Sequence, residues 1–407
     1  MEYDIKKNTI WNIIGTTINA FVSLFLLIIV TRINGTECAG LFSFAFSVSL
    51  VFNVIGVYYG RVYQASDHSD ISDYDYFISK LITCIIMMVV SVLFVFINDY
   101  DTNKLFIVLL LCVYKCIEAY IESLYAVLQK NNQLYKVGIS LSAKGILSII
   151  VFLIVDSITS QMLLAIMSII IIHCLIIVIY DIFNLKKAKV VKTISFNNIK
   201  YLLKDGFYPF LITFLTLYII NSSKYAIDLS LDDTSQAVFG IIIMPATVIL
   251  MFAQYILHPY IVKISDSFEN GDYTQLKKII RMFRSLILIC GLFSVLAAFL
   301  FGIPVLQLIY GIDLMDYRVL LVLIMIGATL YGVVSIFFNI LIIMRKNKLQ
   351  SIILLMVSVL AFVLSYVLTN NYNITGAVLS YLIIMILLFI IYEFLIVFLL
   401  RKGVRNE

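Results

Sequence analysis

The chain has 407 residues, of which 62% are hydrophobic and 13% are charged, and its mean hydropathy is +1.06. This composition lies far from the balance of soluble domains and predicts an integral membrane protein with many spans. The formal net charge of +5 does not indicate nucleic-acid binding, because the Lys and Arg residues lie in short segments between apolar runs and form no continuous patch.

Apolar runs of roughly 20–27 residues follow one another along the chain, and each is long enough to cross about 30 Å of hydrocarbon as a helix. We therefore expect an all-α polytopic membrane protein with about twelve transmembrane helices. The outer connections between the runs are short, so no sizeable soluble domain is expected. The predicted spans are residues 9–33, 38–60, 77–97, 104–129, 137–156, 160–184, 205–228, 236–262, 280–301, 316–344, 349–369 and 374–400.

A basic segment, residues 185–204, separates the first six predicted spans from the last six. It contains six lysines and no acid, and such a segment is held on the cytoplasmic side of a membrane. It therefore divides the chain into an N-terminal lobe (1–184), a basic cytoplasmic linker and a C-terminal lobe (205–407). Its last ten residues predict a helix lying at the membrane surface, with a merely solvated linker as the alternative. The apolar residues at helical spacing there are Phe196, Ile199, Leu202 and Leu203.

The distribution of positive charge predicts the orientation of the chain. If the N-terminus is cytoplasmic, the inner segments hold 23 of the 29 Lys and Arg residues. Both termini are therefore expected in the cytoplasm. The opening sequence MEYDIKKNTIW leads directly into the first span without a small-residue cleavage site, which predicts a retained helix.

Polar and small residues follow one face of each of the first two spans. At 100° per residue, each set falls within a narrow arc. Such stripes suit the wall of a hydrated cavity, and they equally suit close helix packing in lipid. The two sets are Asn12, Gly15, Thr16, Asn19 and Ser23 in the first span, and Ser49, Asn53, Gly56 and Gly60 in the second.

Three of the predicted spans carry a lysine well inside the apolar run, in two of them together with acids. The fourth span carries Lys115, Glu118 and Glu122 on one helix face, with Lys115 near the midplane. Lys144 in the fifth span is predicted at the same depth as Glu122, about 10 Å from the inner face, so the two side chains are expected to be able to meet. The seventh span carries a further i, i+4 pair of charges, namely Lys224 and Asp228.

A charge at such a depth costs at least a few kcal/mol unless it faces protein or water. These residues are therefore expected either to line a pathway or to form internal ion pairs that lock helices together. The cations and acids considered above are equal in number, which keeps the second alternative open. His173 and His258 are isolated on apolar helices and are interpreted as packing or hydrogen-bonded residues. Six cysteines without ligand spacing predict free thiols.

Several segments resemble bacterial polysaccharide-repeat flippases, the Wzx-type O-antigen and capsule translocases of the multidrug/oligosaccharidyl-lipid/polysaccharide exporter superfamily. The opening NTIWNIIGTTINAFVSLFLLIIVTRINGTECAGLFSFAFSVSLVFNVIGVYYGRVYQASD is similar to the start of that family, and TRINGTECAGLFSF to its junction between helices one and two. In the second half, YLLKDGFYPFLITFL, AVFGIIIMPATVIL and SDSFENGDYTQLKKIIRMF resemble the corresponding segments. Family members often carry Asp near the outer end of helix seven, which Asp228 matches if that helix ends near it.

The resemblance implies a MATE-like arrangement of two six-helix lobes around a central cavity in the bacterial cytoplasmic (inner) membrane. It implies a cargo of undecaprenyl-pyrophosphate-linked oligosaccharide moved between leaflets, with membrane lipids as surroundings. A polysaccharide polymerase and a chain-length regulator are the protein partners to expect. The process requires no covalent chemistry, so no catalytic residue, metal or cofactor is expected.

Within that interpretation the intramembrane charges and two arginines at span ends form the expected translocation site. Arg61 and Arg32, at the inner and outer ends of their spans, would guide the pyrophosphate at entry and exit, although interfacial snorkelling is the default for such residues. The full expected set is Lys115, Glu118, Glu122, Lys144, Lys224, Asp228, Arg32 and Arg61.

Three other classes of function compete with this one. A multidrug or cation exporter of the same superfamily would need a net acidic intramembrane site. A membrane polysaccharide polymerase or lipid-dependent glycosyltransferase would need a long outer loop. A structural scaffold would leave the midplane charges only a packing role.

The charge distribution makes a direct topology prediction. Because positive segments stay in the cytoplasm, a reporter domain fused after Lys192 is expected to behave as cytoplasmic and one fused after Asp232 as external. Paired alkaline phosphatase and fluorescent-protein fusions measure this. The reverse pair of results would contradict the twelve-span arrangement.

Overall fold

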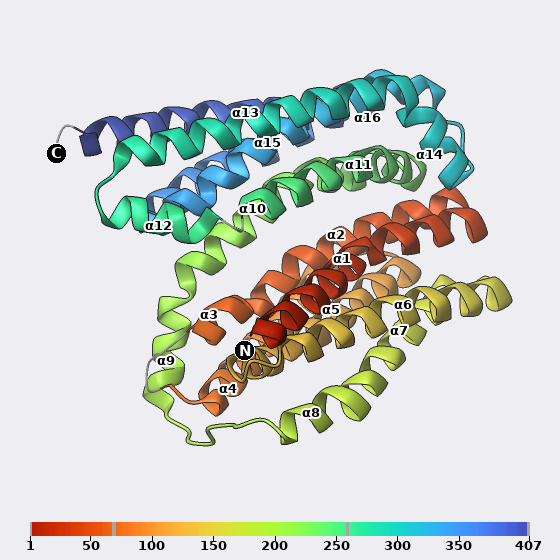
Figure 1. The fold of residues 1–407 in the computed structure, drawn as a ribbon. Coiled ribbons are helices and arrows are strands. Elements are labelled where there is room, and N and C mark those ends of the chain that lie inside the picture. Colours follow the sequence, from red (N-terminus) through yellow and green to blue (C-terminus); the bar gives the residue numbers. More distant parts are fainter. Residues whose placement is uncertain (1, 67–70, 258–259, 405–407) are drawn as a thin grey trace. The chain divides into compact units, whose positions relative to one another are not determined.

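The computed structural model describes residues 2–66, 71–257 and 260–404, and every regular element in these ranges is a helix (Figure 1). The chain divides into two compact units, Met1–Leu217 and Tyr218–Glu407, with the boundary inside one helix. The helices of the first unit are α1 (Glu2–Ile33), α2 (Gly35–Val57), α3 (Gly60–Ser66), α4 (Asp73–Ile97), α5 (Thr102–Lys130), α6 (Leu134–Thr159), α7 (Met162–Ile176), α8 (Ile182–Lys186), α9 (Phe196–Asp205) and the start of α10 (Phe207–Ser230).

The second unit continues from α10 and is also helical. A π-helical turn, Ala298–Gly302, joins its helices α13 and α14 into one long apolar element. The helices of this unit are α11 (Asp233–Leu257), α12 (Ile261–Glu269), α13 (Tyr273–Ala297), α14 (Ile303–Tyr310), α15 (Arg318–Ile343) and α16 (Asn347–Val404).

The expected bundle of about twelve membrane-spanning helices is confirmed. Ten helices in the described ranges are long and apolar enough to cross a membrane. One of them, α16, has 58 residues, and non-helical backbone at Tyr372 and Asn373 divides it into two spans. The remaining predicted span is α5, whose 29 residues are long enough to cross. It differs from the others by carrying three charged residues, Lys115, Glu118 and Glu122, within its apolar run.

Helices α1 and α6 approach each other closely through small residues. A Cβ atom at Gly15 would overlap the backbone of Gly138, and a Cβ atom at Gly138 would overlap the carbonyl of Trp11. Glycine on both helices therefore lets the two backbones touch, as small residues do in membrane helix pairs. Part of the polar stripe in the first span thus serves packing, which was one of the two interpretations of that stripe.

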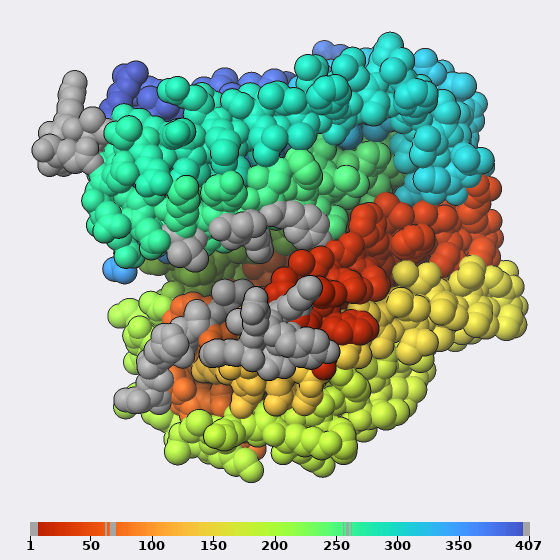
Figure 2. All heavy atoms as spheres, viewed as in Figure 1, coloured from red at the N-terminus to blue at the C-terminus, as the bar shows by residue number. Residues whose placement is uncertain are grey.

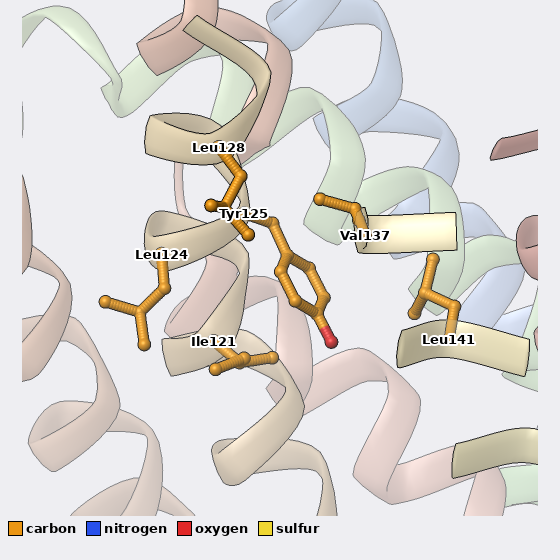
Figure 3. Close-up of a cluster of buried hydrophobic side chains, with 6 residues drawn as sticks. All are labelled: Ile121, Leu124, Tyr125, Leu128, Val137 and Leu141. Atoms are coloured by element: carbon orange, nitrogen blue, oxygen red, sulfur yellow. The ribbon is translucent and has the colours of Figure 1, made fainter. Parts of the chain in front are cut away.

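A cluster of buried side chains fixes α5 against α6 (Figure 3). Tyr125 is fully buried at its centre, and its hydroxyl group lies at the edge of the apolar cluster (Figure 3). The packing therefore holds one polar atom in a defined place between the two helices. The cluster consists of Ile121, Leu124, Tyr125, Leu128, Val137 and Leu141.

The basic linker is held against unit 1 by hydrogen bonds to the start of α4. The Asp73 carboxylate accepts a hydrogen bond from the Val191 amide at 3.0 Å, and the Asp75 carboxylate accepts one from the Ser195 amide at 2.7 Å. Ser72 caps α4 in a capping box with Asp75 and also donates to the carbonyl of Thr193. These contacts give residues 191–195 a defined path along unit 1.

Helix α9, at the end of the linker, turns its apolar face toward protein. Ile199 and Leu202 are buried, and Leu202 packs on Tyr59 and Tyr76. Phe196, by contrast, is 78% exposed. Only part of the apolar set noted in the sequence is therefore free to meet a membrane surface.

Many large apolar side chains are exposed on the outer helices, which is expected where lipid replaces water. Along α13, for example, Ile289, Leu292 and Phe293 are more than half exposed. The side chains of this helix form the teal surface in the space-filling view (Figure 2). Both units thus have the apolar exteriors of a multi-pass membrane protein.

Candidate functional site

A cavity of about 260 Å³ lies within unit 1 among α1, α2, α3, α5, α6 and α7. Five of the predicted site residues line it, together with the polar-stripe residues Asn19 and Asn53 and with His173. The stripes therefore contribute to a cavity wall as well as to packing. The five predicted residues are Arg61, Lys115, Glu118, Glu122 and Lys144.

The centre of the cavity is an ion pair on α5. The Lys115 Nζ lies 2.6 Å from Glu118 Oε2, and the Tyr114 hydroxyl donates to Glu118 Oε1 at 3.1 Å. Lys115 is thirteen residues from the start of α5, which places it about 20 Å along the helix, near its middle. The Asn53 side chain donates to the Lys115 carbonyl at 2.8 Å and so ties α2 to α5 at the same depth.

Lys144 makes the most buried ion pair in the site. Its Nζ lies 2.7 Å from Asp181 Oδ2 and 2.7 Å from the hydroxyl oxygen of Tyr125. The Tyr125 hydroxyl in turn lies 2.8 Å from the Ser140 hydroxyl. The sequence indicated that Lys144 and Glu122 could meet, but Lys144 pairs with another acid. That acid is Asp181, at the end of the π-helical turn that follows α7.

Glu122 instead faces Arg61. The Arg61 Nε lies 3.8 Å from Glu122 Oε2, which is an ion pair without a direct hydrogen bond. Arg61 follows Gly60, whose φ of +72° turns the chain between α2 and α3. The Arg61 Nε and Nη1 atoms are buried and have no hydrogen-bond partner among the described residues. Two guanidinium donors are thus available at the cavity wall.

His173 is hydrogen-bonded, as the sequence indicated, and it also lines the cavity. The carbonyl of Ile169 accepts from its Nδ1 at 2.9 Å, and its ring packs edge-to-face on Tyr114. Its Nε2 lies 3.8 Å from Glu118 Oε1 and has no hydrogen-bond partner among the residues that the structure describes. His258, the other isolated histidine, lies outside the described residues.

The cations and acids of this site are equal in number, but not all of their polar atoms have hydrogen-bond partners among the described residues. Three cations face three carboxylates, counting Asp181 behind Lys144. The unpartnered donors belong to Arg61, and Asp181 Oδ1 and His173 Nε2 lack hydrogen bonds to described residues. A cavity with spare donors on a cation suits an oxyanion. Within the described ranges, no group of three or more His, Cys, Asp or Glu residues is placed to hold a metal ion.

The other predicted residues are not among those that line this cavity. Arg32 is exposed in the last turn of α1, thirteen residues beyond the cavity-lining Asn19, or about 20 Å along the helix. Lys224 and Asp228 belong to unit 2. Lys224 is 8% exposed, and Asp228 lies in the last turn of α10. The roles assigned to these residues remain predictions.

Two residues of the region were not identified from the sequence. Asp181 lies in a π-helical turn, Ile177–Asp181, at the end of the sixth span. It was detectable as an acid within an apolar run. Lys80, near the start of the predicted span 77–97, is buried in α4, where its amine donates to the Val57 carbonyl and lies 4.3 Å from the centre of the Tyr59 ring. No sequence period distinguishes it from an interfacial lysine.

The fold of the chain is similar to that of solved membrane transporters, one of them from the multidrug/oligosaccharidyl-lipid/polysaccharide (MOP) exporter superfamily, in agreement with the resemblance noted in the sequence. A multidrug resistance MATE family transporter of the MOP superfamily, in an inward-facing conformation, matches with a TM-score of 0.68 at 12% identity, covering 96% of this chain and 99% of that chain. The lipid II flippase MurJ, in an inward closed conformation, matches with a TM-score of 0.68 at 16% identity, covering 95% and 87%.

The chain is also similar in sequence to a protein of polysaccharide biosynthesis. The chain is 22% identical over 379 residues to the capsular polysaccharide biosynthesis protein CapF of Staphylococcus aureus, which covers 92% of this chain and 94% of the relative. No protein-family model matches the chain. The similarity extends across both units and is not confined to a single motif.

The Lys144–Asp181 pair can be tested by its effect on stability. Removing one partner of a buried pair leaves an uncompensated charge, so Lys144→Met or Asp181→Asn alone should each destabilise unit 1 by about 3–5 kcal/mol. The double variant should recover part of that loss, with a coupling of about 1–3 kcal/mol. Thermal unfolding of detergent-solubilised protein measures it. Lys144→Met combined with Glu122→Gln is the matched comparison and should show no such recovery. Equal coupling in both pairs would contradict the observed partner choice.

Proposed function

We propose that the chain is a flippase that moves undecaprenyl-pyrophosphate-linked oligosaccharide repeat units from the inner to the outer leaflet of the bacterial cytoplasmic membrane. Its similarity to a capsular polysaccharide biosynthesis protein and to a lipid II flippase supports the proposal. Polysaccharide assembly would use the delivered repeat. A polymerase and a chain-length regulator would then be candidate partners.

The observation that carries this proposal is the buried Arg61 guanidinium with unpartnered donors at the cavity wall. A pyrophosphate cannot enter hydrocarbon without replacement of its hydration. Guanidinium groups bind phosphate oxygens through two parallel N–H donors, which compensates part of that loss. Arg61 would make the first contact, and Lys115 would meet the anion deeper in the membrane. No bond to the cargo is made or broken in this process.

The Glu118 carboxylate has a defined part in this scheme. In the empty site it balances Lys115 at 2.6 Å. An arriving phosphate would compete with Glu118 for that ammonium group, so binding would exchange one ion pair for another. After losing Lys115, Glu118 would keep the hydrogen bond from the Tyr114 hydroxyl, so the displaced carboxylate would retain one partner.

A drug or cation exporter of the same superfamily is the second candidate, and it fits the site less well. A cation needs an excess of carboxylates, whereas here each carboxylate faces a cation. The spare hydrogen-bonding capacity includes two donors of Arg61. The site is therefore better suited to an anion.

A deletion strain tests the function directly. Loss of the gene should make the lipid-linked repeat accumulate on the inner face of the membrane, since synthesis continues while transfer stops. Labelling the repeat in sealed vesicles of defined orientation measures this. Accumulation on the outer face would identify a polymerase instead, and an unchanged amount of repeat with increased drug sensitivity would identify an exporter.

Substitutions at Lys115 and Arg61 should show whether export depends on the positive charge of these side chains or also on their shape. Lys115→Ala and Arg61→Ala should each reduce polymer export about tenfold or more, because a charge-assisted hydrogen bond contributes about 1.5–3 kcal/mol and about 1.4 kcal/mol is tenfold. Lys115→Arg should retain part of the export. Arg61→Lys should retain less, because it keeps the charge but loses the two-pronged geometry. Export is measured per amount of membrane-inserted protein.

Lys346→Ala, in an exposed turn of unit 2, is the control and should export normally. Normal export by both cavity variants to Ala would exclude cargo binding at this site.

A further inference from the structure

A second charged cavity, of about 200 Å³, lies between the start of α13 and the end of α16 in unit 2. Four cations and one acid line it with a few apolar residues. In Figure 1 these two helices run side by side, and in Figure 2 the α13 side chains lie at the surface. The charged residues of this cavity, called the α13–α16 cavity below, are Lys277, Arg281, Arg284, Arg401 and Glu393.

The positions of these residues follow from the helix period. Lys277, Arg281 and Arg284 are spaced i, i+4 and i+7, so they lie on one face of α13. Arg401 follows Glu393 by eight residues, which is about 12 Å along α16. The cations thus extend from the level of Glu393 toward the helix ends. The cations therefore line the cavity over about two turns of α13 and at the end of α16.

Only one of the four cations has an acidic partner here. Arg284 forms an ion pair with Glu393. Among the described residues, no ion pair joins Lys277, Arg281 or Arg401 to an acid. Like charges gathered in this way repel one another, and an anion in the cavity would relieve that repulsion. Its volume greatly exceeds the roughly 10–15 Å³ that one water molecule requires, so a larger group has room.

An apolar stripe continues the same face of α13 beyond the cations. At 100° per residue, Leu288 and Leu292 fall within about 80° of the three basic residues. They are 38% and 60% exposed. A cluster of cations next to an exposed apolar face matches a molecule with an anionic head and hydrocarbon chains.

We propose that the α13–α16 cavity binds the phosphate group of an anionic phospholipid, with its acyl chains along the Leu288–Leu292 stripe. The arginines would bind phosphate oxygens through paired N–H donors, and Lys277 would add charge near the headgroup. This site lies in unit 2 and needs no oligosaccharide, so it goes beyond the proposed cargo site. A free phosphate ion has the same head chemistry but would not use the apolar stripe.

Native mass spectrometry of the purified full chain tests the proposal. Protein in detergent is titrated with dioleoyl-phosphatidylglycerol, with dioleoyl-phosphatidylcholine and, separately, with inorganic phosphate. The wild type should retain phosphatidylglycerol at least fivefold better than phosphatidylcholine. Lys277→Gln with Arg281→Gln should abolish that preference, whereas Lys277→Arg with Arg281→Lys should preserve most of it.

The matched control removes one lysine and one arginine elsewhere in unit 2. Lys346→Gln with Arg345→Gln makes the same change in net charge at exposed positions of the turn after α15. It should leave the lipid preference unchanged. Equal loss in both double variants, or no preference in the wild type, would overturn the proposal. Inorganic phosphate that displaces the lipid supports the phosphate site, and phosphate binding without any lipid preference would overturn the lipid assignment.

Gel filtration and thermal unfolding show whether each variant is folded. If the variant Lys277→Gln with Arg281→Gln is unstable, the test relies on the variant Lys277→Arg with Arg281→Lys. In that case, loss of the lipid preference in the folded charge-preserving variant contradicts a site based on charge, and its retention supports one.

Discussion

A charged group at the depth of the hydrocarbon needs an opposite charge or hydrogen bonds, and this requirement shapes the interior of unit 1. Two of the cavity's ion pairs include a residue of α5, and Lys144 of the third contacts Tyr125 of that helix. Breaking any one of them would leave a bare charge, which costs more than the pair itself contributes to stability. The Lys144–Asp181 and Arg61–Glu122 pairs join different elements and help to hold them in one arrangement, whereas Lys115 and Glu118 both belong to α5. The pairs are Lys115–Glu118, Lys144–Asp181 and Arg61–Glu122.

The fold could be predicted because its main determinant is hydrophobic length. Apolar runs of a membrane-crossing length leave few alternatives to helices, since backbone groups in lipid must bond within their own segment. Where the structure differs, local effects are responsible. The span predicted at residues 280–301 belongs to a longer continuous apolar stretch, Tyr273–Tyr310, in which a π turn at Ala298–Gly302 leads into α14.

The sequence predicted which charged residues form the site, but not which of them pair with each other. Charges within apolar runs identified Lys115, Glu118, Glu122 and Lys144, all of which line one cavity. The partner of Lys144 depends on a different element. Asp181 lies in a π turn, which adds a residue to the helical repeat and rotates the next part of the helix by about 100°. A constant angle per residue therefore cannot predict which side of that helix the carboxylate occupies.

The position of Arg61 depends on contacts outside the cavity. Its helix, α3, and the turn before it contact the segment around the end of α9. The Tyr63 hydroxyl donates to the Asp205 carboxylate, and the Tyr58 hydroxyl donates to the Leu203 carbonyl at 2.7 Å. These two hydrogen bonds tie the chain on either side of Arg61 to the end of the basic linker.

The Tyr58 ring also stacks on Phe210 at 5.0 Å and lies so close to Gly206 that a Cβ atom there would contact it at 2.9 Å. The segment of Arg61 is thus held by the same residues that hold the start of α10, the helix that leads from unit 1 into unit 2. Any change in the direction of α10 at Gly206 must break or carry with it the contacts that position this guanidinium. Arg61 is therefore the cavity residue whose geometry is most directly linked to the connection between the units.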